Sequence, residues 1–207
     1  GEIANVAWLF EYTNPDAVVH LAAKHGGMLA NSKYPAGLMY ENLNMSLRII
    51  EEARQYDCKK FVNAGDICSY PANCPLPFRE EDFWNGHPHP LKSHYAIARK
   101  TISSVLDAYK KQFGLDSTTL IFTDIYGPED EFDPHASKLI PAILTRIRYN
   151  MKLGTDTFES SVDSKSTRDF LFVEDAAEAI VLALEKPTAP SIINVGSGEE
   201  INIKEFI

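Results

Sequence analysis

The sequence predicts an α/β protein in which helices flank a parallel sheet. Short apolar runs rich in β-branched residues alternate along the chain with longer segments whose apolar residues recur at helical spacing. Such an alternation favours parallel strands joined by right-handed helical crossovers. The 207 residues, of which 44% are hydrophobic, can bury the core of one large domain, or of one domain and part of another.

Four apolar segments are the predicted strands. They cover residues 16–23 (DAVVHLAA), 61–64, 118–122 and 192–195. The first is a continuous apolar run with β-branched residues, and we expect it to be a buried parallel strand.

The predicted helices alternate with these strands. A helix ends near Tyr12, before the break at Asn14-Pro15, and further helices cover residues 36–56, 95–113, 138–149 and 176–185. Gly26-Gly27 is expected to turn the chain. Gly114 stands where a helix C-cap glycine belongs, and Asn202 is placed to cap a last helix.

Charge and composition exclude several classes of protein. The net charge of −9 and the pI of about 5.1 argue against a nucleic-acid binder, because that affinity comes largely from Lys and Arg. The apolar runs are shorter than the roughly 18 residues of a membrane span, so we expect no membrane partner. The N-terminus lacks a charged region followed by an apolar stretch, so we expect no signal peptide. The three cysteines (Cys58, Cys68, Cys74) are too few and too irregularly spaced for a disulfide framework, which favours the cytoplasm.

Four motifs resemble those of one known family. Residues 18–31 contain a Gly-Gly-x-x-x-Asn loop, residues 68–71 read CSYP, residues 125–132 read IYGPEDEF, and residues 166–175 read STRDFLFVED. They are similar to motifs of the extended short-chain dehydrogenase/reductases (NAD-dependent epimerase/dehydratases). The first and third are more particular to the GDP-L-fucose synthase branch, whose members are NADP-dependent 3,5-epimerase/4-reductases that act on GDP-4-keto-6-deoxymannose.

The resemblance implies a Rossmann-like fold in two parts. Residues 1–135 would form the nucleotide-binding domain, and residues 136–207 mostly a partial substrate-binding lobe with a returning strand. The chain has no Gly-x-x-Gly-x-x-Gly turn, so we expect it to lack the N-terminal βαβ unit of such a fold and to be a fragment, a trimmed form or a naturally shortened product. The implied cofactor is NADP(H), which we expect to bind weakly without that turn.

Tyr95 is the implied proton donor. A Tyr hydroxyl can deliver the proton of a 4-keto reduction if a nearby cation lowers its pKa, which is near 10 when unperturbed. Arg99 lies one helical turn later, where the family has Lys, and its planar head is a poor replacement. The alternative is an ordinary helix pair at the edge of a pocket.

The other implied catalytic positions only partly match the family pattern. Asp66 aligns with a strand-end Ser, and a carboxylate there would raise the pKa of Tyr95 and repel an oxyanion, unless an ion pair with Arg99 neutralises it. Cys68 aligns with the Cys that acts in epimerisation, although a small buried apolar side chain is an equally good explanation. Lys138 stands where the second epimerisation residue, a His, is expected.

The resemblance also assigns ligand contacts. The expected cofactor contacts are Leu21, Ala22, Ala23, Tyr95, Arg99, Phe122, Asp124 and Ile125. The expected contacts of a GDP-sugar substrate are Asp124, Arg146 and Arg168, since Arg forks suit phosphate. For Arg146 a solvated helix face is a nearly equal alternative.

The histidines have simpler explanations than metal binding. His87, His89 and His94 lack a Cys or carboxylate at a recognisable spacing, so no metal is expected. His20 lies inside a predicted strand, and we expect a hydrogen-bonded core histidine.

Two functional hypotheses follow. The first is a truncated and impaired nucleotide-sugar epimerase/reductase, since three of five expected catalytic positions differ (Asp66, Arg99, Lys138). The second is a non-catalytic relative that keeps the sugar-nucleotide pocket, or only the fold, as a binding or assembly module. Under either hypothesis the resemblance implies a homodimer that pairs through the helices at 36–56 and 95–113.

Overall fold

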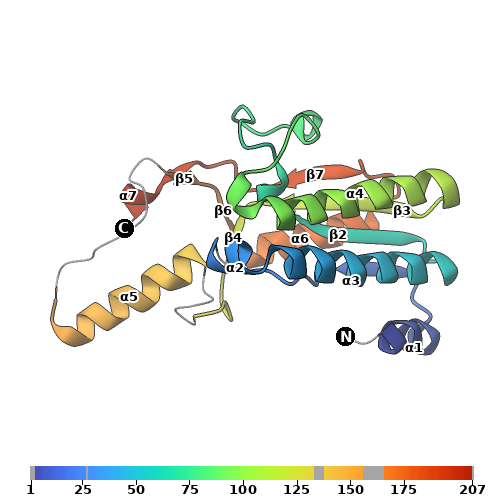
Figure 1. Ribbon diagram of the computed structural model, residues 1–207, viewed down its shortest axis with the longest axis horizontal. Helices are drawn as coiled ribbons and strands as arrows, with labels where there is room; N and C mark the ends of the chain where they lie inside the picture. Colours follow the sequence, from blue (N-terminus) through green and yellow to red (C-terminus); the bar gives the residue numbers. More distant parts are fainter. Residues whose placement is uncertain (1–2, 27, 133–137, 156–165, 207) are drawn as a thin grey trace.

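The computed structural model describes residues 3–26, 28–132, 138–155 and 166–206. Its centre is a four-stranded parallel sheet in the order β1-β2-β3-β7 (Figure 1). The strands are β1 (Ala17–His20), β2 (Lys60–Asp66), β3 (Asp116–Phe122) and β7 (Ile192–Val195). The predicted α/β fold with a parallel sheet is confirmed.

Helices cover both faces of this sheet. α3 (Pro35–Gln55) and α4 (Ser93–Phe113) lie side by side on one face, and α6 (Val173–Glu185) packs on the other (Figure 1). α1 (Ile3–Thr13) packs against α3. The layers are those that alternating strands and helices predict.

Each face of the sheet has its own apolar core. The core beneath α3 and α4 consists of Phe10, Ile50, Ala53, Cys58, Phe61, Ile102, Leu106 and Leu115. The core beneath α6 consists of Val62, Leu120, Phe122, Leu171, Ala176 and Ala183. Phe61 and Val62 are neighbours in β2 and enter opposite cores, because successive side chains of a strand point to opposite faces.

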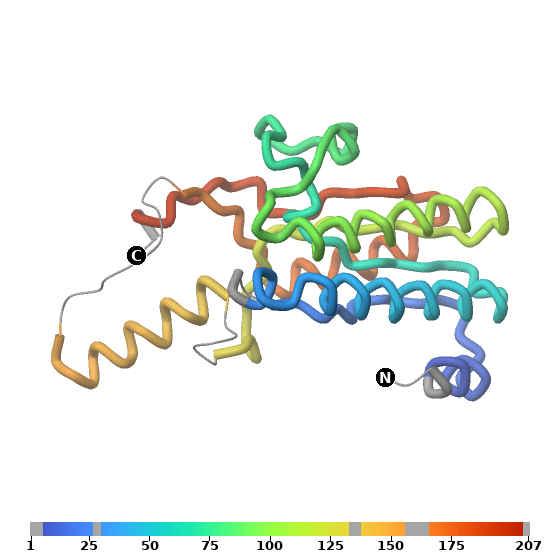
Figure 2. Tube along the Cα trace, in the orientation of Figure 1, coloured from blue at the N-terminus to red at the C-terminus, as the bar shows by residue number. Residues whose placement is uncertain are grey.

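Smaller elements gather beyond the carboxyl ends of the strands. They are α2 (Met28–Lys33), β4 (Asp124–Tyr126), α5 (Leu139–Leu153), β5 (Thr167–Arg168), β6 (Phe170–Phe172), β8 (Ile201–Asn202) and α7 (Ile203–Phe206). β4 pairs with β6 in parallel, β5 pairs with β8 in antiparallel orientation, and α5 extends away from the sheet (Figure 2). Three 3₁₀ turns shape the connection from β2 to α4: η1 (Ile67–Ser69), η2 (Glu80–Asp82) and η3 (Pro90–Lys92).

The predicted helices and strands are all present, with one error of burial. Gly114 has a φ of 76° after α4, and the Asn202 side chain accepts a hydrogen bond from the Lys204 N–H at 2.9 Å, so both predicted caps are confirmed. The buried strand over 16–23 was wrong. β1 ends at His20 and is an edge strand that α6 leaves uncovered, so Val19 is 38% and Leu21 57% exposed.

The remaining predictions about the fold concern a turn, a domain boundary, membrane spans and the cysteines. Gly27 and the domain boundary at 135–136 lie outside the described residues. In the described part of the chain, no helix combines the length and apolar character that crossing a bilayer requires. The three cysteines are free.

Candidate active site

The site begins at the carboxyl end of β2. Gly65 allows β2 to lie close to β3, because a Cβ there would meet the Ile121 side chain and lie 3.1 Å from the Leu120 carbonyl oxygen. The next residue, Asp66, accepts a hydrogen bond from the Cys68 backbone N–H on its Oδ1 at 2.8 Å. This bond caps η1 and fixes the carboxylate at the strand end.

The first turn of α4 brings Tyr95 to this carboxylate. Tyr95 is 7% exposed, and its hydroxyl donates to Asp66 Oδ2 over 3.5 Å. Burial raises the pKa of Tyr95, the Asp66 charge raises it further, and the Arg99 charge acts in the opposite direction. Tyr95 is therefore held as a neutral phenol, and its hydroxyl makes only a long contact of 3.5 Å with the Asp66 carboxylate.

Cys68 lies in η1 and is half-buried. Burial raises the pKa of its thiol far above the ordinary value, and the negative charge of Asp66 adds to the effect. Because only the thiolate is a base or nucleophile, Cys68 is held in the form that can donate a proton but not accept one.

Arg99 does not bind Asp66. The side chain is 4% exposed, and its Nη2 donates to the main-chain carbonyl of Ala64. Among the described residues its Nε and Nη1 find no hydrogen-bond partner. The hypothesis of an Asp66–Arg99 ion pair is therefore wrong for the described residues, because the guanidinium reaches the backbone of β2 two residues before the carboxylate.

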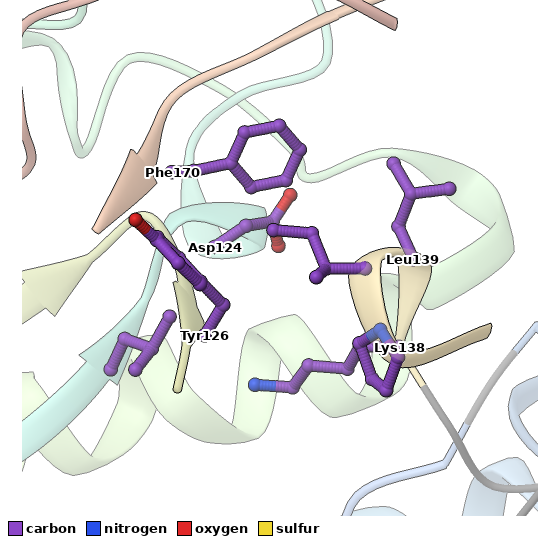
Figure 3. Close-up of a pocket in the computed structure, with 8 residues that line it drawn as sticks. Asp124, Tyr126, Lys138, Leu139 and Phe170 are labelled. Carbon is purple, nitrogen blue, oxygen red and sulfur yellow. The ribbon is translucent and has the colours of Figure 1, made fainter. Parts of the chain in front are cut away.

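A pocket opens beside these groups. Its lining residues come from β4, β6 and the start of α5, and they are Asp124, Ile125, Tyr126, Lys138, Leu139, Ile140, Pro141 and Phe170. Figure 3 shows the Lys138 side chain extending from the start of α5 toward β4. The pocket is thus lined by one basic side chain, Lys138, and one carboxyl group, Asp124.

Asp124 connects the pocket to the Tyr95 end of the site. Burial raises the pKa of Asp124, and the charges of Arg168, Lys92 and Lys138 lower it, while the Asp66 charge raises it. Arg168 Nε lies 3.4 Å from Asp124 Oδ2. The carboxyl groups of Asp66 and Asp124 are therefore close enough for their charges to interact, and three basic side chains surround Asp124.

The remaining predicted contacts divide into two groups. At the carboxyl ends of strands, where open α/β sheets bind ligands, lie Leu21, Ala22, Ala23, Phe122 and Ile125. Arg146, by contrast, lies on an exposed part of α5 and does not line the pocket of Figure 3. Arg146 therefore lies outside the lining of this pocket.

Two residues of the site escaped the sequence reasoning. Asp169 accepts hydrogen bonds from Ser197 N–H and Oγ at 2.9 Å and from Gly198 N–H at 3.0 Å, and its carbonyl accepts the Asp124 N–H at 3.2 Å. It thereby ties the loop after β7 to the start of β4. Lys92 is exposed, and its charge acts on Cys68 and Asp124. Asp169 lies in the STRDF motif, whereas Lys92 has no sequence signal.

The chemistry of these groups bears on cofactor and metal binding. The buried N–H groups of Arg99 that lack a partner, together with the Tyr95 hydroxyl, fit the ribose and nicotinamide end of a dinucleotide. Within the ranges that the structure describes, no three His, Cys, Asp or Glu side chains are grouped to hold a metal ion.

His20 is a core residue. It is 3% exposed, and its Nε2 lies 2.9 Å from Ser46 Oγ. Burial lowers the pKa of His20 to about 4, and the Arg99 charge contributes. The expectation of a hydrogen-bonded core histidine is confirmed.

Comparison with known proteins shows which family and which relatives the chain is similar to. Residues 2–196 match the NAD dependent epimerase/dehydratase family. The chain is 36% identical over 192 residues to GDP-L-fucose synthase of Sinorhizobium fredii. The aligned residues make up 93% of this chain and 61% of the relative. It is 33% identical over 203 residues to GDP-L-fucose synthase 1 of Arabidopsis thaliana, which covers 98% and 63% respectively.

A solved structure agrees with these relatives. The crystal structure of a GDP-L-fucose synthetase from Naegleria fowleri bound to NADP matches with a TM-score of 0.87 and 25% identity, over 96% of this chain and 64% of that protein. The chain therefore spans less than two thirds of the length of these relatives.

Proposed function

Because the chain belongs to the NAD-dependent epimerase/dehydratase family, we propose that it is a nucleotide-sugar epimerase/reductase. Its substrate is GDP-4-keto-6-deoxymannose and its product GDP-L-fucose, as the names of its relatives suggest. The observation that carries the proposal is the meeting of Tyr95 with the strand-end residues Asp66 and Cys68, beside Asp124. This meeting lies at the carboxyl end of a parallel sheet, where such folds bind ligands.

The side chains divide the chemistry among them. When bound, NADPH supplies a hydride to the ketone carbon. Tyr95 donates a proton to the ketone oxygen, and Cys68, held as a thiol, donates one at a neighbouring carbon. Lys138 stands at the position of the second epimerisation group, where it must lose its own proton before it can accept one from carbon. Arg168, and Arg146 if α5 brings it closer, contact the pyrophosphate.

The same residues make the reaction slow. The raised pKa of Tyr95 makes it a weak acid, and the Asp66 carboxylate 3.5 Å from its hydroxyl competes with a substrate for the proton. A carboxylate at position 66 also repels the negative charge that develops on a reduced ketone. Arg99 donates to the Ala64 carbonyl, so part of its hydrogen-bonding capacity is directed away from a ligand.

The cofactor is NADP(H), bound by residues of the 1–135 domain at the carboxyl ends of β1 and β3 and in β4, while residues 136–207 are mostly a partial substrate-binding lobe with a returning strand. Affinity is weak in the chain as given, because a Gly-rich turn normally presents backbone N–H groups and a helix N-terminus to the pyrophosphate. The sequence contains no such turn. Titration of NADPH fluorescence checks this, and low-micromolar affinity would contradict it.

A non-catalytic sugar-nucleotide-binding role is the second candidate. It is favoured by the raised pKa of Tyr95 and by its long hydrogen bond to Asp66, since both oppose transfer of the proton that reduction needs. A site with this bond can hold a ligand without reducing it.

The assembly is a homodimer that pairs through α3 and α4. These helices lie side by side, and α3 exposes Tyr40 and Leu47 to 69% and 41%. Light scattering tests this state, and a clean monomer at high concentration would argue against it.

Turnover is tested by mixing the protein with GDP-4-keto-6-deoxymannose and excess NADPH and following NADPH absorbance. We expect a rate about 10²–10³-fold below an ordinary turnover of about 10 s⁻¹, and none in Tyr95→Phe. Asp16→Asn, at an 84% exposed side chain far from the site, is the control that keeps the rate. A rate near 10 s⁻¹ contradicts impairment, and sugar binding without any turnover selects the second candidate.

A further inference from the structure

Three side chains of the site can donate a proton but not accept one. Burial and the Asp66 charge keep the Cys68 thiol protonated, and Tyr95 is held as a neutral phenol. The side chain of Lys138 is an ammonium group, which donates hydrogen bonds and accepts none. Epimerisation beside a ketone begins with a base that takes a proton from carbon, so another group must supply that base.

Two carboxyl groups at this end of the sheet already have partners. Asp169 accepts hydrogen bonds from the loop after β7 on both of its oxygens. Asp124 Oδ2 lies 3.4 Å from the Nε of Arg168. Asp66, by contrast, forms no ion pair within the part of the chain that the structure describes. Asp66 is therefore a carboxylate with capacity left to accept a proton.

The position of Asp66 brings one of its oxygens to the reacting end of the site. Its Oδ1 accepts the Cys68 backbone N–H at 2.8 Å, which holds the carboxylate in place. Its Oδ2 lies 3.5 Å from the Tyr95 hydroxyl, and the side chain is half-buried, so that a ligand can reach it. Because the proposed reaction places the ketone oxygen at the Tyr95 hydroxyl, the carbons beside the ketone come close to Oδ2 as well.

The charge of Asp66 acts in opposite ways on the two halves of the reaction. During reduction the carboxylate stays ionised while negative charge develops on the ketone oxygen, and the two repel. During proton abstraction the carboxylate takes up the proton as the enolate forms, so its charge disappears as the charge on oxygen appears. The Arg99 charge, which acts on Tyr95 from a side chain with unpartnered Nε and Nη1 among the described residues, stabilises the enolate.

We propose that Asp66 is the general base that removes a proton from the carbons flanking the ketone. The inference rests on the proposed function, because it takes the 4-keto sugar as the ligand. The C–H bond breaks, its proton moves to Asp66 Oδ2, and its electron pair moves into the enolate. A proton returns to the carbon from Cys68 or Lys138. Water then takes the extra proton from Asp66 and returns one to the donor. Abstraction beside a carbonyl is a task that carboxylates perform in other enzymes.

The test measures deuterium exchange without NADPH, so that reduction does not take place. The protein is mixed with GDP-4-keto-6-deoxymannose in D₂O, and NMR spectroscopy follows the loss of hydrogen at the carbons flanking the ketone. A sample without protein gives the background. Reduction is measured separately from NADPH absorbance in the presence of the cofactor.

Asp66→Asn separates a base from a structural residue. Its amide oxygen can still accept the Cys68 N–H, but the amide cannot take up the proton. We expect exchange to fall at least about 10²-fold, the usual contribution of a general base, while reduction becomes faster because the repelling charge is gone. Asp16→Asn, at an 84% exposed side chain, should change neither rate. Circular dichroism verifies the fold of both variants.

The unmodified chain provides a second measurement that needs no variant. A thiol or an ammonium group must lose its proton before it can act as a base, so exchange through Cys68 or Lys138 would rise about tenfold per pH unit between pH 6 and pH 8. Exchange through a carboxylate should stay nearly constant over this range, after subtraction of the background.

The outcomes separate the two proposals. Unchanged exchange in a folded Asp66→Asn, or a tenfold rise per pH unit in the unmodified chain, overturns Asp66 as the base. An equal loss of exchange and reduction in Asp66→Asn also overturns it, because a positioning role would have that effect. If the unmodified chain reduces the ketone but exchanges no deuterium, the base is overturned and the reductase stands. If it does neither, the proposed function fails, and the base that rests on it fails with it.

Discussion

The two ends of the central sheet both bury charged side chains, but they treat them differently. At the amino ends of β2 and β3, Lys60 and Lys110 donate to the two oxygens of Asp116 at 2.6 and 2.8 Å. At the carboxyl ends, Arg99 donates to the Ala64 carbonyl, and its Nε and Nη1 have no partner among the described residues. One end is electrostatically complete, and the other has hydrogen-bonding capacity left for a ligand.

The difference separates structural from ligand-binding charge. Burial raises the pKa of Asp116, but the hydrogen bonds and the charges of Lys110 and Lys60 together outweigh it, so that the pKa is lowered. At the other end, burial raises the pKa values of Tyr95, Cys68 and Asp124, and the local cations offset it only in part. Perturbed groups without full compensation are typical of functional sites.

The largest effect is expected where the carboxyl end is changed back toward the family pattern. Asp66→Ser should raise the rate of 4-keto reduction about 10²-fold, because it removes a repelling charge and restores a donor. Adding Arg99→Lys should exceed the product of the single effects, since both side chains act on Tyr95 and coupled sites are not additive. NADPH absorbance with excess cofactor measures the rates.

The matched control for these variants is Asp16→Asn, which removes one negative charge at a side chain 84% exposed. Circular dichroism establishes that each variant is folded. If folded Asp66→Ser reduces the ketone no faster than the unmodified chain, Asp66 is not what slows the reaction.

A smaller effect is expected at the amino end, where the charge is structural. Asp116→Ala leaves Lys60, whose side chain is 8% exposed, without its carboxylate. We expect the free energy of unfolding to fall by about 2–3 kcal/mol, below the 3–5 kcal/mol typical of fully buried pairs, because Asp116 is itself 23% exposed. Urea denaturation measures the change.

The control for that experiment is Lys59→Ala. It breaks the pair with Asp16, whose partners are 81% and 84% exposed, and should cost at most about 0.5 kcal/mol. If Asp116→Ala and Lys59→Ala lower the free energy of unfolding equally, the ion pairs of Asp116 stabilise the fold no more than an ordinary surface ion pair does.

The sequence allowed much of the fold to be predicted, because its signals are local. Apolar periodicity located α3, α4 and β7, and Gly114 marked the end of α4. The exposure of β1 could not be predicted, since a continuous apolar run does not say whether a helix covers it. The two-residue strands β5 and β8 exist only through their pairing, Thr167 with Asn202 and Arg168 with Ile201, which no local pattern encodes.

The site was predictable in its members more than in its contacts. Motif positions placed Asp66, Cys68 and Tyr95 together, and the structure brings them within reach, while their roles stay predictions. The partner of Arg99 was missed, because helical spacing gives the face of a side chain but not which atom its flexible end reaches. Asp169 was missed because its hydrogen bonds join segments about 28 residues apart.

The smallest expected effect concerns His20, which lies at the carboxyl end of β1 but already has a hydrogen-bond partner in Ser46. Its neighbours are Ser46 of α3, the Phe61 ring of β2 and the Arg99 charge of α4.

The pKa of His20 is about 4 in the folded state against 6.5 unperturbed, so the unfolded chain binds more protons between these two pH values. The free energy of unfolding therefore falls as pH decreases from 6.5 to 4, by about 3 kcal/mol from this group. Urea denaturation from pH 7 to pH 4 should show a shallower decline in His20→Gln, whose amide can still reach Ser46, than in the exposed control His87→Gln. Carboxylates contribute the same slope to all three proteins and cancel in the comparison. Identical slopes in His20→Gln and the unmodified chain would mean that His20 takes up its proton without cost, and that the polar layer at this end of the sheet is open to water.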